Sequence, residues 1–457
     1  MENSNGSKVF HVSLPSGSTQ DVVVPGSSRI VDLQDAAAKS HGHGPLRLVT
    51  QDGHILDPRN RLRDESLGGG EYLTAVAEKT ELLASAFAFV MYLASGVGHI
   101  ETWGLRELTR PRDMPRRIQD GGVKMLQLAA TDYAFAAILE DGTVAAWGDQ
   151  RYGGDCSSVQ AELQDVQQLA ATEYAFAAIL KNRHVVTWGA YFSGGSTSLI
   201  EKHLEDVQQI CGNSMAFAVI CGDGHVVAWG DLDFGGDIRH VSHQLHEVQR
   251  IERSDRAFAA IRRDGSVVTW GHPDYGSDIS KVEDQLTDVK QIAGTRSAFA
   301  AILADGSVVT WGSKKYGGDS SLVQDRLKDV QYIQGTKVSF AAIRANGTVV
   351  TWGEQYSGGD SAAVQDQLKD VRQLSATDLA FAAIRADGSV VTWGDPHSGG
   401  DSRAVQSELQ NVQLIRGSST AFAAILANGG CVTWGDKLAG GNRVRRGHKS
   451  SQSWWPF

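Results

Sequence analysis

Short apolar runs recur along most of the chain, and their length predicts β-strands. In the unit Asp329–Leu368, the stretch Asp329–Ile333 is half polar, Phe340–Arg344 is almost wholly apolar, and Thr348–Trp352 forms a third run. Apolar runs of this length, bounded by turn residues, are typical of strands with both faces covered. An Asn-Gly or Asp-Gly pair between the second and third runs predicts a hairpin. We therefore expect three strands per unit, followed by a Gly-Gly turn and a polar segment.

The repeat is regular enough to define the architecture. Nine Trp-Gly pairs occur, the first two 44 residues apart and each later pair 41 residues after the one before. A period of about 40 residues with about three strands per unit indicates a β-propeller, in which each sheet is stabilised by its neighbours. No stretch has apolar spacing of period 3.6 that is long enough for two helices per unit, so helical repeats are excluded. The tryptophans of the pairs are Trp103, Trp147, Trp188, Trp229, Trp270, Trp311, Trp352, Trp393 and Trp434.

The Val-Val-Thr-Trp-Gly strand followed by a Gly-Gly loop resembles the RCC1 repeat family, whose members form β-propellers. The family's usual Gly-Gln-Leu-Gly loop is replaced here by Gly-Gly-Asp, as at Gly317-Gly318-Asp319, and the units are short for the family. We expect a mostly β fold with an RCC1-like propeller of seven to nine blades, about 41 residues each, over residues 78–441. Aligning Ala88–Leu93 with Ala134–Leu139 gives a degenerate first unit. A nine-blade ring, a terminal cap and an open spiral all remain possible.

Residues 8–77 lack the repeat and show the order ββαββ. The expected helix starts after Ser27 or Ser28 and reaches about Ser40, and the apolar residues of its first turns recur on one face. The expected strands are Lys8–Leu14, Asp21–Val24, Leu46–Thr50, Ile55-Leu56 and Tyr72–Val76.

This order resembles ubiquitin-like domains of the β-grasp fold, and the segment Leu46–Leu56 looks like that family's middle segment. The resemblance implies an apolar recognition patch near Leu48 and Val49. Gly68-Gly69-Gly70 precedes the last strand and the chain continues into the repeats. We therefore expect an integral domain and not a conjugated modifier.

Charge and composition limit the classes of partner that the chain is expected to bind. The formal net charge of −10 over 457 residues argues against binding to nucleic acid or to an anionic membrane. Residues 442–457 form a basic and aromatic tail, which we interpret as a frayed terminus or, less favoured, an import or docking peptide. The first residues lack the pattern of a secretory signal, and the longest apolar run, Leu82–Leu93, is too short to cross a bilayer. A cytoplasmic or nuclear location is expected.

Acidic residues recur at two positions of the unit. The position after Trp-Gly varies, and variation within so faithful a repeat indicates a surface that faces solvent or a partner. Its candidate interaction residues are Asp149, Asp231, Glu354 and Asp395. The position after Gly-Gly is mostly aspartate. Aspartates there could bind a cation or form a turn by bonding the backbone, and the sequence favours the turn.

No catalytic motif is present, and no cofactor or metal site is expected. The spacing of the four cysteines and of His240, His243 and His246 does not suit a metal. The tryptophans are interpreted as packing between blades and not as a ligand-stacking row. About 20 residues follow the last Trp-Gly, too few for the HECT domain that some RCC1-repeat ubiquitin ligases carry.

The function expected from these observations is a non-enzymatic scaffold or adaptor for protein–protein interaction, in ubiquitin signalling. Its expected partners are ubiquitin receptors or ligase components. The alternatives are the substrate-recognition part of a ubiquitin ligase system, a guanine-nucleotide-exchange regulator of a small GTPase, as the RCC1 resemblance implies, and a rim that binds carbohydrate.

Overall fold

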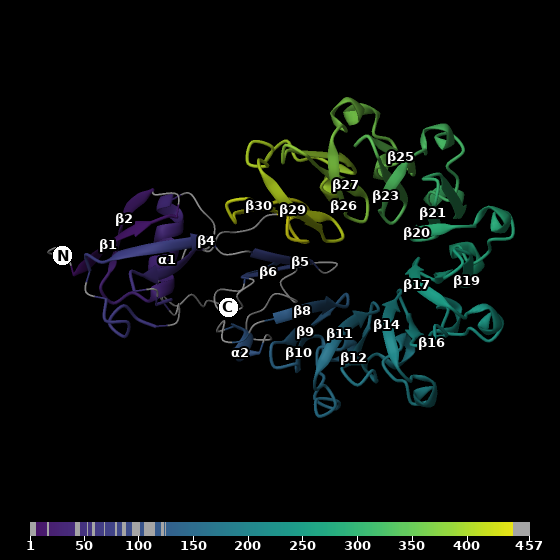
Figure 1. Cartoon of the computed structure of the whole chain (residues 1–457), viewed down its shortest axis with the longest axis horizontal. Coiled ribbons are helices and arrows are strands. Elements are labelled where there is room, and N and C mark those ends of the chain that lie inside the picture. The colour runs from purple at the N-terminus through teal and green to yellow at the C-terminus, as the bar shows by residue number, and fades with distance from the viewer. Residues whose placement is uncertain are drawn as a thin grey trace, which may run out of the picture.

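The chain forms a small α/β head followed by a ring of sheets (Figure 1). The computed structural model describes residues 6–15, 18–41, 46–52, 54–56, 60–67, 69–77, 80–84, 88–93, 101–104, 115–119, 123 and 125–441. The expected tail at 442–457 lies outside the described residues. No helix in these ranges is long and apolar enough to cross a membrane.

The head is a four-stranded sheet with one helix on one face, as the β-grasp interpretation predicts. Its strand order is β2-β1-β4-β3, with β1 and β4 parallel and the other pairs antiparallel. Alternation along each strand sends one set of side chains, including Phe10 and Val12, against Ile30 and Leu33 of the helix. The elements are β1 (Ser7–Ser13), β2 (Thr19–Pro25), α1 (Ile30–His41), β3 (Leu46–Thr50) and β4 (Tyr72–Ala77).

The rest of the described chain contains nine three-stranded antiparallel sheets, each with its second strand in the middle. The first sheet is β5 (Thr80–Ala84), β6 (Ala88–Leu93) and β7 (Glu101–Gly104), and a short helix α2 (Arg116–Gln119) follows it. The remaining strands are β8 (Met125–Ala130), β9 (Ala134–Leu139), β10 (Val144–Gly148), β11 (Val166–Ala171), β12 (Ala175–Leu180), β13 (Val185–Gly189), β14 (Val207–Gly212), β15 (Ala216–Cys221), β16 (Val226–Gly230), β17 (Val248–Arg253), β18 (Ala257–Arg262), β19 (Val267–Gly271), β20 (Val289–Gly294), β21 (Ala298–Leu303), β22 (Val308–Gly312), β23 (Val330–Gly335), β24 (Ser339–Arg344), β25 (Val349–Gly353), β26 (Val371–Ala376), β27 (Ala380–Arg385), β28 (Val390–Gly394), β29 (Val412–Gly417), β30 (Ala421–Leu426) and β31 (Cys431–Gly435).

Short 3-10 helices occupy the polar segments that follow the third strands. They are η2 (Gln150–Tyr152), η3 (Tyr191–Ser193), η4 (Glu201–His203), η5 (Leu232–Phe234), η6 (Ser242–Gln244), η7 (Pro273–Tyr275), η8 (Glu283–Gln285), η9 (Lys314–Tyr316), η10 (Gln324–Arg326), η11 (Gln355–Ser357), η12 (Ala362–Gln367) and η13 (Pro396–Ser398).

The tryptophans pack each sheet against the one before it. Trp311 is buried, and its ring stacks on Phe299 of the neighbouring strand with centroids 5.3 Å apart. Its Nε1–H donates to the carbonyl of Gly276, in the Gly-Gly-type loop of the preceding unit, at 2.9 Å. The same contact recurs from Trp188 to Trp434. Alanines on the middle strand keep both faces thin enough for sheets to stack. The interpretation of these tryptophans as packing residues is confirmed.

The array returns on itself. Leu82 and Phe89 of the first sheet join one apolar cluster with Ala421, Ala423 and Ile425 of the last sheet. Figure 1 shows the first sheet between the last sheet and β8, with the other sheets placed around a central opening. The three options left open by the sequence thus reduce to a ring of nine sheets, a β-propeller.

Candidate functional site

The loops that join the first and second strands of the regular units lie around the central opening. In each loop one backbone N–H donates to the carbonyl of the equivalent residue one unit later, at 2.8 to 3.2 Å, from Asp132 through Asp378. These hydrogen bonds fix the backbone from unit to unit, so the side chain at this position is free to vary. We call the residues at this position in the described units the mouth ring: Asp132, Glu173, Ser214, Asp255, Arg296, Lys337, Asp378 and Ser419.

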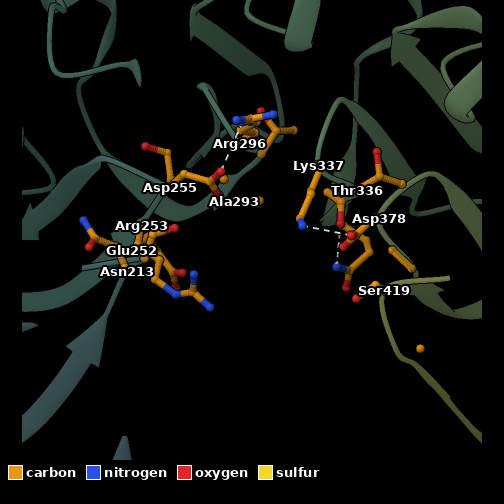
Figure 2. Close-up of a pocket in the computed structure, with 18 of the residues that line it drawn as sticks. Asn213, Glu252, Arg253, Asp255, Ala293, Arg296, Thr336, Lys337, Asp378 and Ser419 are labelled. Carbon is orange, nitrogen blue, oxygen red and sulfur yellow. Dashed lines mark hydrogen bonds and ion pairs between the residues drawn. The ribbon is translucent and has the colours of Figure 1, made fainter. Parts of the chain in front are cut away.

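The mouth ring opens into a cavity of about 680 Å³ at the centre of the propeller. Figure 2 shows two groups of polar side chains that face each other across open space. One group includes Asp255 and Arg296, and the other includes Lys337 and Asp378. Nε of Arg296 lies 3.3 Å from Oδ2 of Asp255, and Nζ of Lys337 lies 2.8 Å from Oδ2 of Asp378. Both cations of the mouth ring therefore have a carboxylate partner within the ring.

Burial raises the pKa of the aspartates in the mouth ring. Burial, and then the neighbouring charge of Glu173, raise the pKa of Asp132 to about 6, although Lys337 opposes this shift. Burial also raises the pKa of Asp255 and of Asp378, against the attraction of Lys337. Burial alone would lower the pKa of Lys337, but the charges and hydrogen bond of its acidic neighbours raise it overall. The mouth thus holds charges in a partly desolvated place, where their interactions are strong.

Aromatic side chains extend from one side of the mouth ring. The ring of Tyr133, next to Asp132, has its centroid 5.1 Å from that of Tyr152 and 6.3 Å from that of Tyr174. Tyr174 lies 5.1 Å from Tyr152 and 5.8 Å from Phe192. We call these four residues the aromatic rim. Tyr133 is 40% exposed and Phe192 51% exposed, so the rim presents apolar surface to solvent.

Hydrogen bonding couples the aromatic rim to the mouth ring. The hydroxyl of Thr131 donates to the carbonyl of Tyr152 at 3.2 Å, which ties η2 to the loop that carries Asp132 and Tyr133. Burial, followed by the carboxylates of Glu173 and Asp132, raises the pKa of Tyr174 to about 12. The phenol therefore stays protonated at any ordinary pH.

The predicted acidic rim residues occupy the N-caps of the 3-10 helices. Asp149 accepts from the N–H of Arg151 at 2.9 Å and also pairs with its guanidinium. Asp231 accepts from the N–H of Asp233 at 2.9 Å, and Asp395 from that of His397 at 3.3 Å. These half-buried carboxylates thus have a local structural role, and a role in partner binding stays a prediction.

Glu354 stands at the same N-cap position of η11. Its side chain makes no capping hydrogen bond in the described residues. It remains a predicted interaction residue.

The aspartates after Gly-Gly form the predicted turn, in which the side chain bonds the backbone. Oδ1 of Asp319 accepts from the N–H of Ser321 at 3.0 Å, and the same bond occurs at the equivalent aspartates. The members of this series are Asp155, Asp237, Asp278, Asp319, Asp360 and Asp401. Within the described ranges, no group of three or more His, Cys, Asp or Glu side chains could hold a metal ion.

The structure of the head contradicts the prediction for one of the two residues expected in its recognition patch. Leu48 is fully buried in the head core, so its prediction as an exposed anchor is wrong. The reason is the period of two: Leu46 and Leu48 both point toward the helix, and Val49 lies on the opposite face. Val49 is half-buried there and forms a bridge with Ile55.

The face of the head sheet away from the helix carries exposed apolar side chains. Val23, Tyr72 and Val76 are all exposed on it. The Tyr72 ring stacks on His11 with centroids 4.6 Å apart. We call this surface, together with Val49, the outer face. The alternation of the strands contains the signal for these residues, because each is one position away from a core residue.

Sequence reasoning missed the mouth ring and the aromatic rim. The residues concerned change from unit to unit, whereas their neighbours Thr131 and Ala134 recur in similar form. An alignment of the repeat units with one another, compared position by position, would have shown Asp132 and Glu173 at one register position. Their closeness across units follows only from the ring.

No protein-family model and no curated protein sequence matches the chain. Among solved structures, it is similar to yeast RCC1 (Prp20) bound to Kap60, with 15% identity and a TM-score of 0.41 over 76% of this chain and 88% of that one. It is also similar to Prp20p from Saccharomyces cerevisiae, with 15% identity and a TM-score of 0.40 over 79% and 94% of the two chains.

A design based on ubiquitin matches 16% of this chain and 88% of its own length, with 26% identity and a TM-score of 0.15. At TM-scores of this size, the propeller and the β-grasp-like head rest on the chain's own sheets, their order and the 41-residue repeat.

Proposed function

We propose that the chain is a non-enzymatic scaffold for protein–protein interaction, in which the head docks a ubiquitin receptor and the ring presents a second surface. The observation that carries the proposal is the outer face: exposed apolar side chains on a sheet whose other side is filled by α1. Exposed apolar residues surrounded by polar ones are the usual energetic centre of a protein interface.

The ring supports the same function in a different way. Its buried positions repeat almost unchanged, and the backbone of the mouth loops is fixed by hydrogen bonds from unit to unit. The side chains at the mouth and on the 3-10 helices differ between units. A rigid frame with varied surface positions suits recognition of a protein surface, because little conformational entropy is lost when a partner binds.

The head is tested by surface plasmon resonance with the full chain and a panel of immobilised ubiquitin-binding domains, some helical and some zinc-containing. We expect weak binding to at least one domain and a loss of roughly tenfold or more in Val76→Asp, since the change puts a charge into an apolar contact. Leu199→Asp is the matched control, because Leu199 is an exposed leucine on the ring. Absence of binding to every domain would refute the ubiquitin link.

The non-enzymatic part has its own test. Release of a labelled guanine nucleotide from a panel of small GTPases should proceed at the same rate with and without the chain. A clear acceleration that depends on the ring would replace the scaffold proposal with the exchange-regulator alternative.

A further inference from the structure

We propose that the aromatic rim, together with Asp132 and Glu173, binds an extended, arginine-bearing segment of a partner protein. The proposal rests on the scaffold function and names the chemistry of the partner for the ring. It concerns a surface separate from the outer face of the head, so the two can fail independently.

The first step is the surplus of negative charge at this side of the mouth. Arg296 and Lys337 are engaged by Asp255 and Asp378. No ion pair in the described residues involves Asp132 or Glu173. Burial, and then the repulsion from Glu173, raise the pKa of Asp132 against the attraction of Lys337. An incoming cation would relieve this repulsion, whereas the phosphates of a nucleic acid would add to it.

The second step is the aromatic surface beside these carboxylates. A guanidinium group binds the face of an aromatic ring and still donates hydrogen bonds from its edge. Tyr133 and Tyr174 follow Asp132 and Glu173 directly in the sequence. Burial, followed by the carboxylates of Glu173 and Asp132, raises the pKa of Tyr174, so both carboxylates lie near this ring. One arginine can therefore stack on a ring and pair with a carboxylate at once.

The chain itself shows that arginine fits this kind of surface. Further along the same side of the ring, Cζ of Arg256 lies 4.5 Å from the ring centroid of Phe234 and 4.9 Å from that of Tyr275. Phe234 and Tyr275 hold the position that Tyr152 holds in its own unit. Arg256 holds the position of Tyr133 and Tyr174. In the rim, Tyr133 and Tyr174 fill this place themselves, so a partner's arginine would meet the exposed sides of Tyr133 and Phe192.

The spacing of the rim suits an extended chain. In a β-strand, side chains two residues apart lie on the same side at about 6.6 Å. The centroids of Tyr133 and Tyr174 are 6.3 Å apart, and those of Tyr174 and Phe192 are 5.8 Å apart. Alternate residues of an extended segment therefore meet successive rings, and the cavity beside them leaves room for a side chain that points inward.

The test uses the full chain and three fluorescein-labelled peptides in which serine alternates with arginine, with lysine, or with citrulline. Fluorescence anisotropy measures binding at several salt concentrations. We expect the arginine peptide to bind more tightly than the lysine peptide, because the planar guanidinium stacks on rings. The neutral citrulline peptide should bind weakest, because it keeps the shape of arginine and lacks the charge.

Paired variants separate the rim from general attraction to an acidic protein. Tyr133→Ala should weaken the arginine peptide roughly fivefold to tenfold, and the double change Asp132→Asn with Glu173→Gln should do so by at least as much and reduce the salt dependence. Tyr356→Ala is the aromatic control, since Tyr356 is 82% exposed on η11 in another unit. Asp274→Asn is the charge control, because its carboxylate is almost fully exposed.

Two results would overturn the proposal. One is no binding of the arginine peptide, and the other is an equal loss in the rim variants and their controls, which would mean attraction to the overall charge alone. Val76→Asp in the head should leave peptide binding unchanged. Peptide binding therefore reports on the ring even if the head proves to bind nothing.

Discussion

The hairpin between the second and third strands of each unit tests how the repeat depends on one glycine. In seven of the eight regular units this position is glycine with a positive φ, and in one unit it is Arg183 with φ +70°. At Gly388, φ is +79°, and a Cβ atom would lie 2.8 Å from Cα of Asn411, where the next unit begins. At Gly388 the backbone is therefore left-handed, and a side chain would also crowd the backbone of Asn411.

Two opposite substitutions follow from this geometry. Gly388→Val forces a β-branched residue into the left-handed region, at about 1–2 kcal/mol, and adds a close contact with backbone, so we expect a loss of roughly 2–3 kcal/mol. Arg183→Gly removes the same kind of strain. The extra conformational freedom of glycine in the unfolded chain offsets part of this gain, at about 0.5–1 kcal/mol. The substitution should stabilise the protein by roughly 0.5–1 kcal/mol.

Thermal melting gives the overall effect, and hydrogen exchange locates it. The N–H of Val412 donates to the carbonyl of Gly388 at 2.9 Å, so its exchange should accelerate in Gly388→Val. Ala386→Val is the control, because Ala386 is exposed in the same hairpin and its φ is not positive. An unchanged melting temperature in Gly388→Val, or a lower one in Arg183→Gly, would refute the reasoning.

Two further predictions concern buried polar groups. Trp311→Ala should lower the free energy of unfolding by roughly 3–5 kcal/mol, as a large truncation in the core. Trp311→Phe should lower it by about 1–3 kcal/mol, because phenylalanine keeps the stacking on Phe299 but leaves the buried carbonyl of Gly276 without its donor. Equal melting temperatures for the two variants would contradict this. Because burial raises the pKa of Asp132 to about 6 in the folded chain, its stabilising contribution is complete below about pH 4 and is lost as pH rises through 6. Asp132→Asn should therefore raise the free energy of unfolding at pH 8 by about 1–2 kcal/mol after allowance for solvent screening, and raise the melting temperature accordingly. The effect at pH 4 should be smaller.

The propeller and the head could be predicted because both are periodic. Trp-Gly and Asp-Gly at a step of 41 residues determine where strands and hairpins fall, and alternation in β1 and β3 separates core from surface. The error at Leu48 came from placing a patch by family likeness when the alternation already assigned Leu48 to the core.

Ring closure could not be predicted in the same way. It depends on the angle between neighbouring sheets summed over all units, and no single unit contains that sum. The apolar cluster that contains both Phe89 and Ala421 joins residues more than 300 positions apart. For the same reason, the sequence gives the register position of the mouth residues but not which of them face each other across the opening.

The mouth of the ring combines a cost in stability with an advantage in binding. An ionised Asp132 beside Glu173 destabilises the folded chain at neutral pH, as its raised pKa implies. Such a carboxylate is strained until a cation reaches it, and the arginine of a partner would recover part of that free energy on binding. Asp132→Asn should then stabilise the free protein and weaken the arginine peptide in the same experiment. If the variant gains stability and loses no affinity, the carboxylate has no role in recognition, and the aromatic rim alone would have to account for any binding at the mouth.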